Sequence, residues 1–136
     1  MREPRQKLGD IARPYFDAAA RGELVIPQCN SCRRHFFYAT VLCQHCHSGD
    51  WEWVRSDGAG AIYSHTAVHR PLGSSLPAPY IVVVVELDEG IRMMGNLLDC
   101  ADDVVKIGQR VSVDFAPSWQ GDAVPMFRLA GDRPAA

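Results

Sequence analysis

The chain has 136 residues, of which 47% are hydrophobic and 22% are charged, and its formal net charge is -2 at pH 7. That length suits one ordinary domain, or a small domain plus a very small one, and the composition excludes a disordered tail. The slightly acidic balance provides no basic face of the kind that nucleic-acid binders carry, so composition argues against a polyanionic partner.

The first ten residues, "MREPRQKLGD", are polar and are expected to be loose. They lack the apolar core of a secretory signal, and the longest apolar run, residues 81–85, is too short to cross a bilayer. We therefore expect a cytoplasmic protein whose thiols are kept reduced.

A short helix is predicted next. Pro14 suits its first turn and Gly22 its C-terminal end. Apolar residues at helical spacing give this helix one side that can dock on another element. They are Tyr15, Phe16, Ala19 and Ala20.

Four of the five cysteines follow the predicted strand "ELVIPQ", as two Cys-x2-Cys pairs: Cys29 with Cys32, and Cys43 with Cys46. Two such pairs can surround one ion, and zinc accepts four thiolates in a tetrahedron. Ten residues separate the pairs, which is enough for a hairpin, and "HFFYAT" supplies strand-forming residues for it. Because so short a segment has few apolar side chains to offset its ordering entropy, we expect a structural zinc to stabilise it.

Other interpretations of the cysteines stay open from the residues alone. Two disulfides are disfavoured in a reducing compartment. Iron in a rubredoxin-like site is disfavoured because Arg33 and His47 stand where such knuckles usually carry glycine. His45 or His47 could replace a thiolate, although four cysteines already close the site. A closed four-thiolate site has no open position for water, so it implies a structural role.

The rest of the chain is rich in predicted strands and turns. "WEWVR" places Trp51 and Trp53 on one strand face, Gly58 and Gly60 suggest a turn or bulge, and five strands follow with a helical turn between the third and fourth. Five strands in so short a segment favour closure, and the OB-fold is the barrel with a helix at that position. The fold class is therefore mainly β, with a short helix, a rubredoxin-like zinc ribbon and a five-stranded OB-fold barrel.

The second barrel strand, "PYIVVVVELD", is apolar on both faces. Ile81, Val83, Val85 and Leu87 are expected to fill the barrel, while Tyr80, Val82 and Val84 point outward. A strand that is apolar on both sides is usually buried on both. We expect the helix, the cysteine module or another chain to cover the outer face.

No arrangement of residues indicates catalysis. Cys100 reads as a small buried hydrophobe, and Asp102-Asp103 as the start of the helical turn. His65 and His69 are predicted to share a strand face with Tyr63 as solvated or hydrogen-bonded side chains. They would lie about 13 Å apart, too far to bind one ion together. The loop "RPLGSSLPAP" between the first two barrel strands borders the usual OB binding face.

Taken together, these segments resemble a family of acyl-CoA-associated proteins (domain of unknown function, family thirty-five). The resemblance covers residues from about 14 to 130. It rests on "GELVIPQCNSC", "CQHC", "WEWVRSDGAGAIYSHTAVHR", "PYIVVVVELDEGIRMMGNLLD", "IGQRVSVDF" and Phe127. The chain departs from many relatives at "FFYAT", where they are proline-rich, and at Gln44, where they carry proline.

The resemblance implies a role as well as a fold. Family members accompany thiolase-superfamily enzymes, including synthases and steroid side-chain retro-aldolases, and help shape the acyl-CoA channel. It implies that Cys29, Cys32, Cys43 and Cys46 are zinc ligands and that this chain supplies no catalytic residue. Boundaries are expected at 1–22 for the helical segment, 23–56 for the ribbon, 57–131 for the barrel and 132–136 for a tail.

Three functions follow as hypotheses. The first is a non-catalytic partner subunit of a thiolase-like enzyme, with the outer face of the second barrel strand as part of the docking surface. The second is an independent acyl-CoA binding module, in which Arg33, Arg34 or Arg70 would contact the phosphates. The third is a zinc-ribbon nucleic-acid binder, disfavoured by the acidic balance and by the few aromatic residues on the barrel strands.

Overall fold

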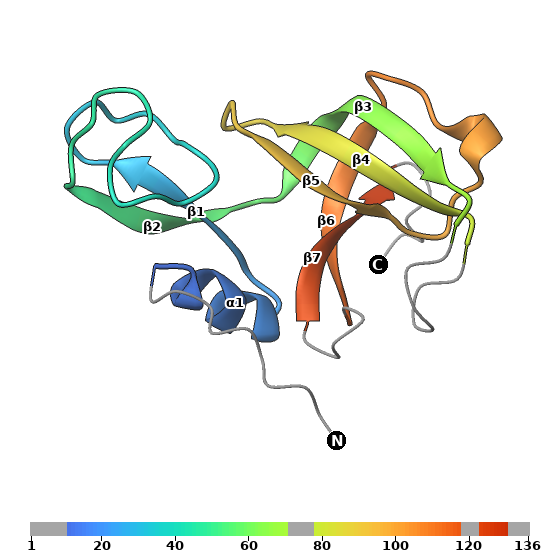
Figure 1. Cartoon of the computed structure of the whole chain (residues 1–136), viewed down its shortest axis with the longest axis horizontal. Helices are drawn as coiled ribbons and strands as arrows, with labels where there is room; N and C mark the ends of the chain where they lie inside the picture. The colour runs from blue at the N-terminus through green and yellow to red at the C-terminus, as the bar shows by residue number, and fades with distance from the viewer. Residues whose placement is uncertain (1–10, 71–77, 118–122, 131–136) are drawn as a thin grey trace.

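The computed structural model describes residues 11–70, 78–117 and 123–130, which form a small two-stranded lobe, one α-helix and a closed barrel (Figure 1). The expectations for the first ten residues, for most of the loop between the first two barrel strands and for the tail at 132–136 lie outside these residues.

Helix α1 (Arg13–Ala20) begins with proline in its first turn and is followed by Gly22 at φ 76°, as predicted. It packs chiefly against strands β1 and β7. Its docking side is formed by Ala18 and Ala19, which are buried, and by Tyr15. The expectation for Ala20 was wrong: this residue is exposed, because the buried stripe continues from position 15 to 18 and 19. No helix in the described ranges could span a membrane.

The small lobe is a two-stranded antiparallel sheet of β1 (Leu24–Cys29) and β2 (Trp51–Ser56). Its pairing runs from Leu24 opposite Ser56 to Cys29 opposite Trp51, so the strands bring the two ends of the cysteine segment together. The rings of Trp51 and Trp53 lie 5.5 Å apart in an edge-to-face contact, which confirms that they share one face.

The predicted hairpin strand at "HFFYAT" does not form: in the described chain its only pairing is an isolated bridge between Gln28 and His35. The side chains explain the difference. Phe36 packs against the cysteines, whereas Phe37 packs against the larger core of the barrel. This division of adjacent rings between two cores outweighs their preference for a strand.

The larger unit is a closed barrel with the strand order β3-β4-β5-β7-β6, which confirms the predicted OB-fold. A single 3-10 turn, η1, lies between the third and fourth barrel strands, as expected. The elements are β3 (Ala59–Val68), β4 (Tyr80–Leu87), β5 (Arg92–Leu97), η1 (Asp102–Val104), β6 (Arg110–Pro117) and β7 (Ala123–Leu129).

Strand β4 shows the predicted difference between its faces. Ile81, Val83, Val85 and Leu87 are buried in the barrel core. The opposite side chains of Tyr80, Val82 and Val84 are half-buried. Helix α1 packs chiefly against β1 and β7 (Figure 1), so it is not the main cover of this face.

Two close approaches hold the barrel together. A Cβ atom at Gly60 would lie 2.4 Å from the carbonyl oxygen of Glu86, so only glycine lets β3 approach β4 this closely. Strands β5 and β7 share one registered pair, Leu97 with Phe127. A hydrogen bond from the amide of Leu98 to the carbonyl of Phe127, 2.8 Å long, extends this short seam.

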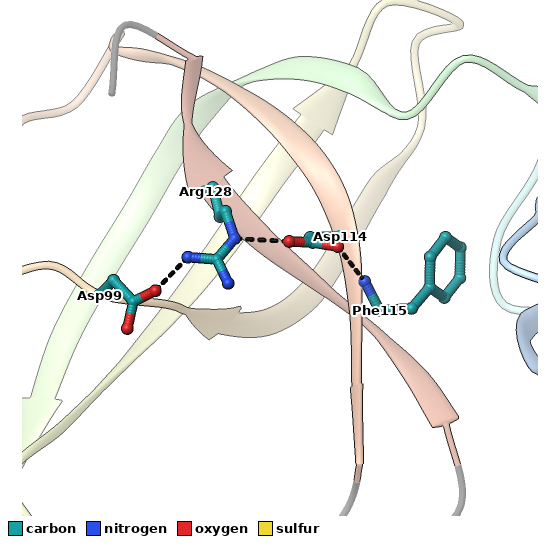
Figure 2. Close-up of polar contacts among 4 residues, drawn as sticks. All are labelled: Asp99, Asp114, Phe115 and Arg128. Atoms are coloured by element: carbon teal, nitrogen blue, oxygen red, sulfur yellow. Dashed lines mark hydrogen bonds and ion pairs between the residues drawn. The ribbon is translucent and has the colours of Figure 1, made fainter. Parts of the chain in front are cut away.

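A charged cluster reinforces the same seam (Figure 2). Arg128 on β7 donates hydrogen bonds to Asp99, which follows β5, and to Asp114 on β6. Asp114 also accepts the backbone amide of Phe115 at 2.8 Å. The pKa of Arg128 is raised by its hydrogen bonds to Asp114 and then to Asp99. One guanidinium therefore links three neighbouring parts of the barrel: strand β6, strand β7 and the segment that follows β5.

Candidate metal centre and adjoining groove

The four sulfur atoms of the cysteine pairs converge on one point. The sulfurs of Cys29, Cys32, Cys43 and Cys46 all lie within 4.8 Å of one another, with Cys29 and Cys46 at 3.5 Å and Cys32 and Cys43 at 3.7 Å. Four thiolates at about 2.3 Å from one zinc ion in a tetrahedron stand about 3.8 Å apart. The observed spacing fits this arrangement and is much longer than a disulfide, whose sulfurs are about 2.05 Å apart.

The two cysteine pairs have the same backbone conformation. The amide of Arg33 donates to the carbonyl of Cys29 at 3.0 Å, and the amide of His47 donates to the carbonyl of Cys43 at 3.0 Å. Arg33 and His47 both have positive φ, at 66° and 63°. The knuckle conformation thus forms without the glycines whose absence argued against iron as the bound metal.

Backbone amides also point at the sulfurs. The amide of Cys32 donates to the sulfur of Cys29 at 3.5 Å, and that of His45 to the sulfur of Cys43 at 3.3 Å. The Cys32 amide is the chief reason that the pKa of Cys29 is lowered to about 6. At Cys46 the amide of Ser48 lowers the pKa, but the thiol of Cys29, burial and the other thiols together raise it to about 11. Four thiols this close ionise fully only around a cation.

The other predicted site residues do not join this centre. His45 places its Nε2 atom 3.1 Å from the carbonyl oxygen of His35, away from the sulfurs. Arg33 and Arg34 are exposed on the first knuckle, and Arg70 is exposed beyond the end of β3, which lies on the far side of the barrel from the ribbon (Figure 1). The structure therefore does not assemble the three arginines into one phosphate site.

The histidine prediction was wrong in its geometry. A β-bulge between Ile62 and Ser64 shifts the register of β3, so Tyr63 is 48% exposed. His65 instead pairs with the buried Val83, and its Nδ1 atom is buried without a hydrogen-bond partner in the described residues. Cys100 packs against the barrel core, as expected for a small hydrophobe.

A groove of about 400 Å³ lies where the helix, the small lobe and the barrel meet; we call it the junction groove. Sequence reasoning missed it, because its walls come from separate segments that only the tertiary fold assembles. Its lining residues are Ala12, Tyr15, Phe16, Phe37, Tyr38, Ala39, Trp53, Met94, Gly95, Asn96, Val124, Pro125 and Met126.

A run of aromatic rings in edge-to-face and tilted contacts connects the metal centre to this groove. Phe36, which packs against the cysteines, contacts Trp51 at 5.5 Å between ring centres, and Trp51 contacts Trp53 at the same distance. Trp53 lies 6.3 Å from Tyr15, which contacts Phe37 at 5.9 Å. The hydroxyl of Tyr38, next in the chain, accepts the amide of Met94 at 3.4 Å and so joins the ribbon to the barrel.

A second groove of about 420 Å³ lies on the barrel, away from the cysteines. It is bordered by Tyr63 and Ile107, and the guanidinium of Arg92 lies 3.9 Å above the Tyr63 ring. Asp88 accepts two hydrogen bonds of 2.8 Å from Arg110, which lower its pKa. The charged side chains at this groove form ion pairs, Glu86 with Arg92 and Asp88 with Arg110. The groove therefore presents no unpaired charge that would bind a charged ligand.

Comparison with known proteins identifies both lobes. Residues 16–52 match the family model described as "ChsH2, rubredoxin-like zinc ribbon domain", and residues 53–116 match "ChsH2, C-terminal OB-fold domain". A DUF35 domain-containing scaffold protein of Methanothermobacter thermautotrophicus is 33% identical over 108 residues, which are 78% of this chain and 81% of that protein.

Two further relatives extend the match. A probable enoyl-CoA hydratase alpha subunit of Thermomonospora curvata is 36% identical over 127 residues, 93% of this chain, but this chain spans only 40% of that subunit. A solved structure titled "Ltp2-ChsH2(DUF35) aldolase" contains a chain that is 34% identical, with a TM-score of 0.83 over 93% of this chain and 99% of that one. The chain therefore belongs to the DUF35 family of zinc-ribbon and OB-fold proteins.

Proposed function

We propose that this chain is a non-catalytic partner subunit of an enzyme that acts on acyl-CoA thioesters. The observation that carries the proposal is a structural match over nearly the full length of both chains, at 34% sequence identity. The matched chain belongs to the structure titled "Ltp2-ChsH2(DUF35) aldolase". The hydratase alpha subunit adds support, because 93% of this chain matches one part of a larger CoA-thioester enzyme subunit. The finer proposal is that the partner belongs to the thiolase superfamily and that the complex is cytoplasmic.

The metal centre has a structural role in this proposal. Cys29, Cys32, Cys43 and Cys46 would hold one Zn²⁺ as a closed four-thiolate site, and the ion would fix the ribbon against the helix and the barrel. The sulfur spacing and the amides that point at two of the sulfurs support this assignment. The expected boundaries of the helical segment, ribbon and barrel at 22/23 and 56/57 remain part of the proposal.

Co-expression tests the function. The tagged chain is produced together with a thiolase-like subunit from the same organism, and with the Ltp2 subunit as a second probe. We expect a stoichiometric complex on size-exclusion chromatography with measurable lyase or thiolase activity, whereas the chain alone shows no turnover. A chain that elutes alone beside both subunits, while its metal content is intact, would contradict the proposal.

A further inference from the structure

The four cysteines of the metal centre differ in their exposure to solvent. Cys29 and Cys43 are completely buried, at 0% exposure, whereas Cys32 is half-buried and Cys46 is exposed. A cysteine that binds a metal ion is a thiolate, and the oxidation of cysteine follows thiolate character and exposure. Because Cys46 combines both properties, an oxidant in solution reaches its sulfur first.

Cys46 also has a second sulfur within reach. Its sulfur lies 3.5 Å from that of the buried Cys29, closer than the 3.7 Å between Cys32 and Cys43. A small displacement would bring the first two sulfurs to the roughly 2.05 Å of a disulfide bond. An exposed thiolate beside a second cysteine that can resolve it is the arrangement found in redox-sensing cysteines.

The second knuckle, residues 43–48, depends on its metal ligands for its position. The amide of Cys43 donates to the carbonyl of Ser48 at 2.8 Å, so this backbone hydrogen bond closes the knuckle on itself. Side chains link it to neighbouring segments, as in the 3.0 Å hydrogen bond between the hydroxyls of Ser31 and Ser48. The first knuckle instead begins within strand β1, at Cys29. Loss of a ligand should therefore affect the second knuckle more than the first.

We propose that Cys46 is a site of reversible oxidation by a peroxide, and that the resulting disulfide with Cys29 releases the metal ion. In the first step the thiolate of Cys46 attacks a peroxide oxygen; an S–O bond forms, the O–O bond breaks and hydroxide leaves. The thiolate of Cys29 then attacks the sulfur of Cys46; an S–S bond forms, the S–O bond breaks and a second hydroxide leaves. The two thiolates together lose two electrons, which reduce one hydrogen peroxide to two hydroxide ions.

Oxidation would leave the centre with two thiolates, those of Cys32 and Cys43. Because the metal supplies much of the free energy that orders a small ribbon, the second knuckle should then detach. Trp51 would report this change, since its indole nitrogen donates to the carbonyl of Val41, just before the knuckle, at 3.2 Å. The inference concerns this chain alone and does not rest on the proposed function.

Zinc release and the identity of the oxidised cysteines provide the test. The zinc-loaded full chain is treated with hydrogen peroxide beside a chromogenic zinc chelator, then alkylated, digested without reduction and mapped by mass spectrometry. At half release we expect about one link between Cys29 and Cys46 for each released ion, with Cys32, Cys43 and Cys100 recovered in alkylated form. Tryptophan fluorescence should change at the same rate, and dithiothreitol with added zinc should reverse both signals.

Three variants isolate the role of Cys46, and the zinc content of each is measured before peroxide is added. Cys46→His keeps a zinc-compatible ligand without the oxidisable sulfur, so its zinc should leave at least about tenfold more slowly than from wild type. Cys32→His is the matched control, because it makes the same change in the first knuckle and keeps both Cys29 and Cys46. It should release zinc at least about threefold faster than Cys46→His does. Cys100→Ser removes the thiol outside the cluster and should release zinc at the wild-type rate.

Several outcomes would overturn the inference. One is a first disulfide between Cys32 and Cys43, and another is oxidation of Cys100 ahead of Cys46. A third is release of zinc from Cys46→His at the wild-type rate. If Cys46→His does not bind zinc, the mapping of the wild-type chain decides: a link between Cys29 and Cys46 at half release supports the inference, and any other first product contradicts it.

Discussion

Arg33 and His47 occupy equivalent positions in the two knuckles, and both have left-handed backbone conformations, with φ values of 66° and 63°. Each follows the second cysteine of its pair and donates its amide to the carbonyl of the first cysteine. Non-glycine residues rarely adopt this conformation, at a cost of about 1 kcal/mol. The cationic side chain of Arg33 can offset part of the charge that four thiolates leave on a divalent ion.

This relationship predicts the effect of glycine at position 33. Arg33→Gly should raise the free energy of unfolding by about 0.5–1 kcal/mol, because glycine adopts positive φ without strain. Arg34→Gly is the control: no positive φ is found at Arg34, so this change should lower stability slightly. Urea unfolding of both zinc-loaded variants measures the difference. A destabilised Arg33→Gly would show that the charge of Arg33 outweighs the strain.

Loss of one thiolate should dismantle the ribbon. Cys43 is fully buried, and Cys43→Ser is expected to reduce bound zinc from about one ion per chain to a small fraction. Structural zinc contributes roughly 10–16 kcal/mol in small finger peptides, so the ribbon should lose its ordered tryptophan signal. Mass spectrometry for metal and near-UV circular dichroism provide the two measurements. Cys100→Ser, outside the cluster, should keep its zinc; a Cys43→Ser protein with full zinc content would contradict the assignment.

The close approach at Gly60 predicts a selective effect of an added methyl group. Gly60→Ala would place Cβ 2.4 Å from the Glu86 carbonyl oxygen and 2.9 Å from the Cα of Leu87. Because backbone cannot move aside as a side chain can, we expect a loss of about 1–3 kcal/mol. At Gly49 the nearest atom to an added Cβ is a Leu42 methyl at 3.6 Å, so Gly49→Ala should be nearly neutral. Equal thermal midpoints for the two variants would be inconsistent with this packing.

The cluster of Arg128, Asp99 and Asp114 should contribute more to the free energy of unfolding than an exposed ion pair does. The side chain of Arg128 is 34% exposed and contacts two carboxylates, that of Asp99 across the β5–β7 seam and that of Asp114 on the neighbouring strand β6. Arg128→Met leaves Asp99 and Asp114 without their shared cation and should cost about 1–2 kcal/mol. In the exposed pair of Arg110 and Asp88, both side chains are more than half exposed, and Arg110→Met should lower stability less than Arg128→Met does. Chemical denaturation of both variants compares them directly.

The pair of Asp88 and Arg110 also predicts a pH dependence. Hydrogen bonds from Arg110 hold the pKa of Asp88 below its ordinary value of 3.8. A lowered folded-state pKa stabilises the protein above the unfolded-state value, and this contribution is lost as pH falls through the folded-state pKa. Arg110→Gln should therefore raise the pKa of Asp88 toward 3.8, and its stability deficit should disappear in more acidic solution. Carboxyl chemical shifts followed by NMR test the shift; an unchanged pKa would show that the pair does not persist in solution.

Much of the architecture could be predicted from local patterns. Alternation along β4 identified Ile81, Val83 and Val85 as core residues, because the period of a strand appears directly in the sequence. The spacing of the four cysteines identified the metal centre for a similar reason, since each pair is a local structure in itself. These features depend on neighbours in the chain.

Features that depend on distant residues were not predictable. The bulge at Tyr63 leaves no mark on the alternation around it, yet it moves His65 to the buried side of β3. Adjacent Phe36 and Phe37 look like a strand, but each ring belongs to a different core. The junction groove joins segments from positions 12 to 126, so only the folded chain could reveal it.

The aromatic run from Phe36 to Tyr38 makes the two lobes interdependent. A barrel excised from this protein would lose the rings that now shield its flank, and an isolated ribbon would present Trp53 to water. Each fragment should be less stable and more prone to aggregate than the whole chain. Engineering that transplants the barrel should therefore include the ribbon and helix α1 as well.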